Sequence, residues 1–277
     1  MGWAVVLLAV AGVAPAFGLG AVRARAEASM LVTGTIDIEE DGWVSGHLID
    51  REEALPPGVA AFVGQAASGW RFEPVLVDGS PVKARTPMSL RVVARKEGES
   101  AYKVDIRGAS FGNAPAGEFP SRVDMKPPKY PYELRWAGVS GTVYLVLRLG
   151  PHGQVEDVVT EQVNLRTIAR ERQMERFRDL MANASLMAAK SWTFAAPAEG
   201  PAAGETGWTV RVPVDFHIYG ERQAGYGQWE AYVPGPRQGI PWMGPEVRGF
   251  SPDALAAGGV YPLEHHGPRL LTELDGA

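Results

Sequence analysis

The sequence contains no cysteine among its 277 residues. This absence excludes disulfide bonds, thiolate catalysis, cysteine-ligated metal sites and a lipidated N-terminal cysteine. It is compatible with an oxidising compartment, because an unpaired thiol there would be open to unwanted pairing.

A surplus of positive charge is also missing. The 27 basic and 32 acidic residues give a net charge of −5. Because nucleic-acid binding needs a basic surface, we expect no nucleic-acid partner. The composition, 45% hydrophobic and 21% charged, is ordinary for a globular protein, and the length accommodates two modest domains with additional ends.

Catalytic motifs are absent as well. The sequence has no G-x-S-x-G elbow, no Walker loop and no dinucleotide-binding glycine pattern. The acidic run at 39–41 falls in a predicted hairpin turn, which favours a solvated turn over an acid and base pair. The histidines have no metal-ligand spacing: His47, His152, His217, His265 and His266. We therefore expect no enzymatic activity, no cofactor and no catalytic or metal-binding residue.

The N-terminal segment is uncharged and strongly apolar. Residues 2–22 carry no charged side chain, and Ala26-Glu27-Ala28 follows with the pattern of a signal-peptidase site. We interpret residues 1–28 as a cleaved signal peptide. The alternative is a retained anchor, with inner-membrane association through residues 2–22. Both interpretations predict an exported chain.

Residues 29–108 predict a first α+β unit. Alternating apolar side chains favour strands at 30–39, 43–49, 89–94 and 102–106. Apolar residues spaced for one face of a helix lie between the second and third of these strands: Val59, Phe62, Val63 and Ala66. Trp70 and Phe72 then share one face of a short strand.

Residues 126–219 predict a second unit, after a Gly- and Pro-rich linker at 109–125. Its strands are expected at 141–149, 154–159, 192–194 and 208–216. The intervening charged helix should bury Met174, Phe177, Leu180 and Met181. Its charges favour an exposed, ion-paired surface: Arg166, Arg170, Glu171, Arg172, Glu175, Arg176 and Arg178.

The two units carry matching signals in the same order. The matched segments are 34–36 with 141–143, 41–44 with 152–155, 70–74 with 192–197 and 87–90 with 213–216. We interpret this as an internal duplication, and the alternative is two unrelated segments with similar turn residues. The predicted fold class is α+β, with two tandem modules that each combine an antiparallel sheet and one helix.

Residues 220–277 predict an irregular tail rich in glycine, proline and aromatic residues. Proline removes backbone donors and fixes φ, which argues against a packed sheet or a long helix. We interpret this segment as loosely ordered. The alternative, suggested by its aromatic content, is an arm that covers the two units or docks a partner.

Five segments of the second unit carry a family resemblance: Pro-Lys-Tyr-Pro at 128–131, Gly-Val-Ser-Gly-Thr-Val at 138–143, Gly-Gln-Val at 153–155, Trp-Thr-Phe at 192–194 and the strand at 210–216. In this order they resemble the C-terminal domain of TonB-type energy transducers. Residues 31–93 resemble a weaker copy of the same unit, so the resemblance implies a tandem duplication in the periplasm.

In that family the closing strand pairs with an extended peptide of an outer-membrane receptor, by main-chain hydrogen bonds. The resemblance implies this protein-binding role for Trp208, Thr209, Val210, Arg211 and Val212. Pro213 cannot donate to a partner strand, so pairing is expected in this half of the strand. Alternation places four side chains on the outward face: Thr209, Arg211, Pro213 and Asp215.

These features predict a periplasmic TonB-like module that binds an extended segment of an envelope or outer-membrane transport protein by strand addition. The alternative is a structural or assembly protein of the envelope without an energy-transducing role. It is suggested because residues 22–31 hold no long spacer and residues 2–22 hold no histidine. An open edge at 208–212 favours the first function, and a covered edge favours the second. Open sheet edges also predict homodimers.

Overall fold

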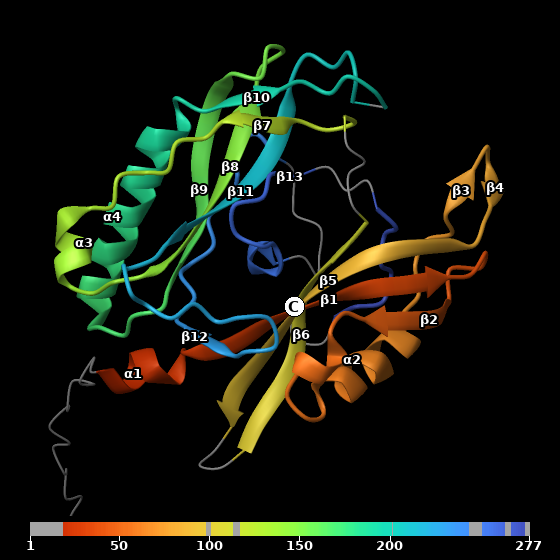
Figure 1. Cartoon of the computed structure of the whole chain (residues 1–277), viewed down its shortest axis with the longest axis horizontal. Coiled ribbons are helices and arrows are strands. Elements are labelled where there is room, and N and C mark those ends of the chain that lie inside the picture. Colours follow the sequence, from red (N-terminus) through yellow and green to blue (C-terminus); the bar gives the residue numbers. More distant parts are fainter. Residues whose placement is uncertain are drawn as a thin grey trace, which may run out of the picture.

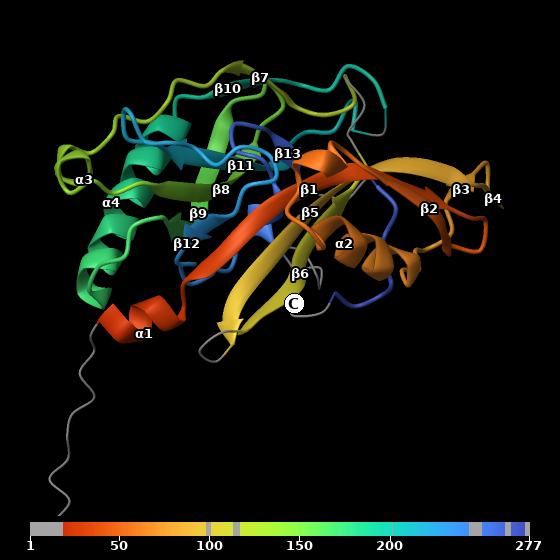
Figure 2. The ribbon, with the colours of Figure 1, turned by 60° about the horizontal axis from the view of Figure 1, so that its bottom comes forward.

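The structure, a computed structural model, describes residues 19–97, 101–112, 117–200, 202–243, 251–263 and 267–274. It is a mixed α+β fold with mostly antiparallel sheets and few helices. Two larger sheets form its centre, and α2 and α4 lie on their outer sides (Figure 1). The C-terminal segment, drawn in blue, lies where the two sheets meet (Figure 2).

The helices are α1 (Leu19–Ala24), α2 (Val59–Ser68), α3 (Tyr132–Trp136) and α4 (Glu171–Ala189), with 3₁₀ turns at Glu52–Ala54 and Pro252–Ala254. The first large sheet contains β1 (Glu27–Ile38), β2 (Val44–Ile49), β5 (Ala84–Glu97), β6 (Ala101–Phe111) and β12 (Glu230–Tyr232). The second contains β8 (Gly141–Leu149), β9 (Val155–Leu165), β11 (Trp208–Phe216) and β13 (Tyr261–Pro262). Two small ribbons pair β3 (Leu76–Val77) with β4 (Ser80–Pro81) and β7 (Ser121–Asp124) with β10 (Thr193–Ala195).

In the first sheet, β1 lies between β5 on one side and β2 and β12 on the other, and β6 pairs with β5. Strand side chains alternate between the two faces. Met30, Val32 and Leu90 belong to the apolar core with α2. Leu31 and Arg91 are therefore on the opposite face, which is turned toward the second sheet.

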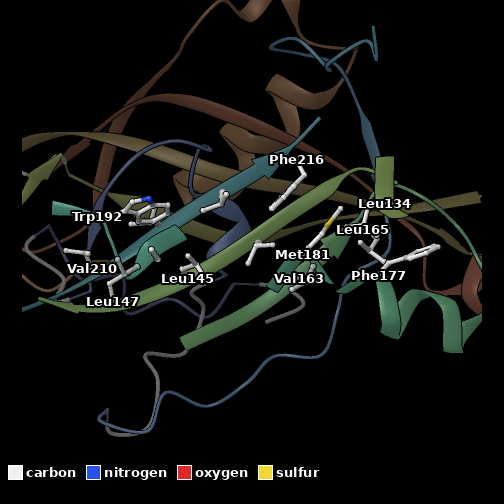
Figure 3. Packing of buried hydrophobic residues seen from close by; sticks show 14 of the residues in the cluster. Leu134, Leu145, Leu147, Val163, Leu165, Phe177, Met181, Trp192, Val210 and Phe216 are labelled. Carbon is white, nitrogen blue, oxygen red and sulfur yellow. The ribbon is translucent and has the colours of Figure 1, made fainter. Parts of the chain in front are cut away.

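The second sheet has the order β9, β8, β11, β13, and α4 covers one of its faces. Figure 3 shows Leu145, Leu147 and Val210 of this sheet packed with Met181 and Phe177 of α4. Each such side chain, when fully buried, stabilises the fold by about 1.5–3 kcal/mol. This cluster explains the long apolar strands in the sequence.

The two large sheets repeat one order of connections. In each, a hairpin precedes a helix, a short Trp-x-Phe segment and a closing strand that pairs with the first strand of the hairpin. The N–H of Phe72 donates to the carbonyl of Gly42 at 2.8 Å, and the N–H of Phe194 donates to the carbonyl of Gly153 at 2.9 Å. Both glycines have positive φ, 86° and 74°, which only glycine adopts without strain.

The strongest strand predictions are confirmed. Those at 141–149 and 208–216 coincide with β8 and β11, and the predicted helix is α4. Met174, Phe177 and Met181 are buried as expected, whereas Leu180 is only partly buried.

The predicted ion pairs along one exposed face of α4 need correction. Arg176 pairs with Glu133 of α3 at 2.7 Å, and Glu171 contacts Arg25. Arg178 is buried and donates to the carbonyl of Val163 at 3.2 Å. The helix therefore uses Arg176, Arg178 and Glu171 to hold neighbouring segments, and within the helix Glu171 also lies 4.0 Å from Arg178.

The predicted linker at 109–125 contains parts of two strands. β6 continues to Phe111, and β7 pairs with β10 in the register Thr193↔Asp124. The partner of β7 comes much later in the chain, so the local glycine and proline content could not reveal this pairing. Residues 113–116 lie outside the described residues.

The interpretation of residues 220–277 as a loosely ordered tail is wrong for their described parts. β12 pairs with β1, and Val233 exchanges hydrogen bonds of 2.7 and 3.1 Å with Leu165, the last residue of β9. β13 pairs with β11, and Leu270 forms a bridge with Phe72. The segment is irregular, but it ties the first sheet to the second.

The N-terminal prediction falls mostly outside the described residues, which begin at Leu19. From Leu19 onward the chain packs against the rest of the protein. Val22 of α1 is 2% exposed and lies in the core beside α4. Ala28 pairs with Ala94 and Ala231. Within the described part of the chain, we find no helix that is both long and apolar enough to cross a membrane.

Candidate functional site

The edge of β11 is the site that the sequence predicts, and the tail occupies it. Val210 lies opposite Pro262 and Arg211 opposite Tyr261. The N–H of Leu263 donates to the carbonyl of Thr209 at 2.9 Å, and that of Gly258 to the carbonyl of Pro213 at 3.0 Å. We call residues 258–263 the clasp. Its strand register falls within 208–212, the half of β11 that was expected to pair.

The predicted outward face of β11 is covered rather than exposed. Arg211 is 7% exposed, and its guanidinium group donates to both carboxylate oxygens of Glu161 at 2.8 and 3.0 Å. Arg237 of the tail donates to the same carboxylate at 2.9 Å. The three side chains form an ionic cluster around the buried Glu161 that fastens the tail to the second sheet.

A β-bulge positions Glu161 for this role. Tyr144 lies opposite Gln162 and Leu145 opposite Thr160, so Glu161 is the extra residue of β9. Burial raises the pKa of its carboxyl group, but hydrogen bonds and charge from Arg211 and then Arg237 outweigh it and lower the pKa. Simple alternation along β9 could not predict that the side chain of Glu161 faces Arg211.

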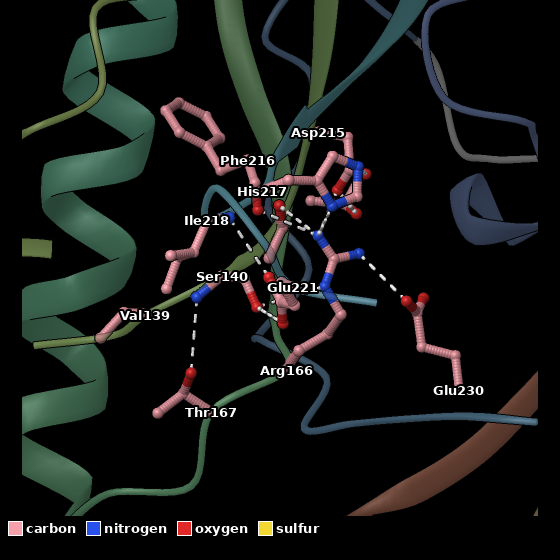
Figure 4. A network of polar contacts seen from close by, with 12 residues as sticks. Val139, Ser140, Arg166, Thr167, Asp215, Phe216, His217, Ile218, Glu221 and Glu230 are labelled. Carbon is pink, nitrogen blue, oxygen red and sulfur yellow. Dashed lines mark hydrogen bonds and ion pairs between the residues drawn. The ribbon is translucent and has the colours of Figure 1, made fainter. Parts of the chain in front are cut away.

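A second polar network surrounds Arg166, which follows β9 (Figure 4). Its guanidinium group donates to Asp215 at 2.5 Å, to Glu230 at 3.3 Å and to the carbonyl of Phe216 at 3.0 Å. Arg166 also donates to the hydroxyl of Ser140 at 3.4 Å, and this hydroxyl donates to Glu221 at 2.6 Å. Arg166 was expected on an exposed helix face, but it joins the ends of β8, β9 and β11 to the tail.

The contacts of His217 determine its tautomer. Nδ1 lies 3.4 Å from Nη2 of Arg166, and a guanidinium group can only donate. Nδ1 is therefore the acceptor, so Nε2 carries the proton and donates to Asp215. Both nitrogens are engaged, which leaves this imidazole no nitrogen for proton transfer to a substrate.

A polar cavity of about 250 Å³ lies between the two sheets. Arg91 of β5 faces Asp253, with 3.6 Å between Nε and the carboxylate, and its guanidinium group lies 5.1 Å from the ring centre of Tyr232. Tyr144 of β8 and Asn164 of β9 line the opposite wall. Sequence analysis missed this site because residues from both sheets and the tail form it.

The histidines considered as metal ligands are dispersed. His47 and His152 are exposed in separate hairpins, and His265 and His266 lie outside the described residues. In the ranges that the structure covers, no group of three or more His, Asp and Glu side chains is arranged to hold a metal ion.

The geometry therefore offers two features that could bind a ligand: the edge of β11 under the clasp, and the polar cavity between the sheets. Comparisons of the chain with protein-family models, with curated proteins and with solved structures gave no match.

Proposed function

We propose that this chain is a periplasmic protein-binding module related to TonB C-terminal domains, and that β11 accepts an extended segment of an envelope or outer-membrane transport protein. The observation that carries the proposal is the clasp itself. The edge of β11 already holds an extended segment through main-chain hydrogen bonds, in the half of the strand predicted for pairing.

The proposal includes two tandem copies of one unit. Its support is the repeated order of hairpin, helix, Trp-x-Phe segment and closing strand. The turn contacts of Gly42 with Phe72 and of Gly153 with Phe194 recur at nearly the same distances. Unrelated segments have no reason to share both the strand order and these backbone contacts.

The two closing strands differ in how firmly their outer edges are paired. In the first copy, β6 pairs with β5 at ten positions, from Met88↔Phe111 to Glu97↔Ala101. In the second copy, β13 pairs with β11 at two positions, and the clasp residues 259–263 are half-buried. A partner segment at β11 therefore has to displace only a short strand, which makes this edge the better acceptor.

A specific observation supports a second function, that of a structural or assembly protein without energy transduction. The tail pairs with β1, β11 and the end of β9, so it joins both sheets. If the clasp never leaves, β11 offers no edge to a partner. The two functions therefore differ in whether the clasp can be displaced.

The test compares Leu263→Pro with Leu271→Pro. Each substitution removes one N–H that binds the tail to a sheet: Leu263 donates to Thr209 at 2.9 Å, and Leu271 donates to Arg71 at 2.8 Å. Only the first loosens the clasp. The probe is a fluorescent peptide with the sequence of residues 258–263, and its binding is followed by anisotropy.

If β11 accepts strands, Leu263→Pro should bind the peptide at least about tenfold more tightly than the wild type or Leu271→Pro, because one hydrogen bond that holds the competing clasp is lost. A photo-reactive residue at Thr209 should then crosslink to an outer-membrane protein in envelope fractions. Equal, negligible peptide binding by all three chains, with crosslinks only within the chain, would support the structural function.

A further inference from the structure

The polar cavity between the sheets is open to a small molecule. Its volume of about 250 Å³ is slightly below the usual range for small-molecule sites, roughly 300–1,000 Å³. Part of its lining comes from exposed tail residues: Gln223, Ala224, Ala256 and Ala257. A ligand can therefore enter along the tail without separating the sheets.

Tyr144 presents a hydroxyl to the cavity that has no protein partner among the described residues. Its side chain lines the cavity although only 5% of the residue is exposed, and its hydroxyl makes no hydrogen bond to any residue in the described ranges. Burial raises its pKa, so the hydroxyl stays protonated. A hydroxyl that faces a cavity without a protein partner is free to bond a ligand atom.

Two further cavity residues carry unpaired donors. Nδ2 of Asn164 and Nε of Arg91 are buried and have no hydrogen-bond partner among the described residues. A guanidinium nitrogen and an amide nitrogen only donate, and the Tyr144 hydroxyl can donate as well. The group that completes this site therefore has to offer acceptor oxygens.

The charges around the cavity select against an ionic ligand. Three carboxylates, those of Asp215, Glu230 and Asp253, face the guanidinium groups of Arg91 and Arg166. The carboxylates of the lining therefore outnumber its guanidinium groups by one. This excess repels an anion, whereas an ammonium group would have to compete with Arg91 and Arg166 for carboxylates that they already face.

We propose that the cavity binds a neutral, hydroxyl-rich molecule of monosaccharide size. Each sugar hydroxyl both donates and accepts, so it can donate to Asp215 or Asp253 while it accepts from Tyr144. Leu31 and Leu255 supply apolar walls for the carbon face of a sugar ring. The site lies on the sheet faces, not on the edge of β11, and does not depend on strand addition.

The first experiment titrates the full chain with neutral hexoses (glucose, galactose and mannose) and with glucuronate and glucosamine as charged analogues. Isothermal calorimetry or amide chemical shifts report binding. At least one neutral hexose should bind saturably at millimolar concentration. Its charged analogue should bind at least about tenfold more weakly, because the excess carboxylate repels glucuronate and glucosamine has to compete with Arg91 and Arg166 for the carboxylates.

The variant that tests the site is Tyr144→Phe, which removes the unpaired hydroxyl and keeps the ring. It should weaken hexose binding about tenfold, the effect of one hydrogen bond. Tyr102→Phe is the matched control, because Tyr102 is 65% exposed on β6 and outside the cavity. This control should bind like the wild type.

Thermal unfolding separates a lost site from a lost fold. Without sugar, Tyr144→Phe and the wild type should unfold at similar temperatures, because the hydroxyl has no protein partner. With sugar, only the wild type and Tyr102→Phe should unfold at a higher temperature. The proposal is overturned if no neutral hexose binds at millimolar concentration, or if Tyr144→Phe binds it as tightly as the wild type.

Discussion

Gly153 lies directly against the carbonyl oxygen of Phe194: a Cβ at this glycine would be 1.7 Å from that oxygen. Gly42 has the same relation to Phe72, at 2.0 Å. In both sheets the turn of the hairpin is thus held against the Trp-x-Phe segment, and only glycine leaves room for the contact.

We predict that Gly153→Ala and Gly42→Ala each lower the free energy of unfolding by about 3 kcal/mol or more, because the backbones must separate and a positive φ must be strained. Gly138→Ala is the control, since its φ is 65° but a Cβ would meet nothing within 4 Å. It should lose about 1 kcal/mol. Urea unfolding of the three variants measures this. Similar losses at Gly42 and Gly153 support the duplication, and a loss at one position alone contradicts it.

The buried Glu161 gives a second prediction. Glu161→Gln removes the buried carboxylate charge that faces the guanidinium groups of Arg211 and Arg237, which should cost about 3–5 kcal/mol of stability. Glu156→Gln on the same strand is the control, because its contact with Arg148 is 3.9 Å long and solvent-exposed. Its effect should stay within about 0.5 kcal/mol. Chemical denaturation at neutral pH compares the two, and equal effects would show that the ionic cluster is not stabilising.

The lowered pKa of the Glu161 carboxyl group predicts that the stability of the fold depends on pH. The pKa of Glu161 is lower in the folded chain than its reference value of 4.5. Its contribution to stability is therefore fully present above about pH 4.5 and is lost as the pH falls through the folded-state pKa. Denaturation between about pH 6 and pH 3 should show a steeper loss for the wild type than for Glu161→Gln. Parallel curves would contradict a lowered pKa.

Removal of residues 19–28 should destabilise the protein. A chain that starts at Ser29 lacks the buried Val22 and two positions of β1, so its unfolding free energy should fall by about 2 kcal/mol or more. Within the chain that starts at Leu19, Val22→Ala should reproduce part of this loss, whereas Arg23→Ala at an exposed position should not.

This result bears on the N-terminal interpretation. A signal peptidase that cut after Ala28 would remove residues that the fold uses, so we expect the protein purified from cells to retain Val22. Intact-mass measurement tests this expectation directly. A mature chain that starts at Ser29 and is as stable as the longer one would contradict it.

The strands predicted most accurately are those whose own residues carry a strong apolar pattern. β8 and β11 are long and apolar, and the cores on which they depend lie within the same unit. The glycine turns could be recognised for the same reason, because a positive φ depends on the residue itself. The α+β class follows from such local signals.

The parts that could not be predicted depend on distant partners. The clasp is a strand only because β11 lies beside it, and Tyr261 and Pro262 have no alternating pattern of their own. Glu161 turns toward Arg211 because of a β-bulge, which alternation does not reveal. Arg166 could have been suspected from its place between a strand and a helix, but its partners come from three other segments.

The pairing of β1 with β12 is completed late in synthesis. Glu27 accepts a hydrogen bond from Tyr232, 205 residues later in the chain, so the start of β1 gains this partner long after β2 and β5 have appeared. Contacts across such separations close slowly. A chain that emerges from its N-terminus would therefore keep the β12 side of the first sheet unpaired until residue 232 has appeared.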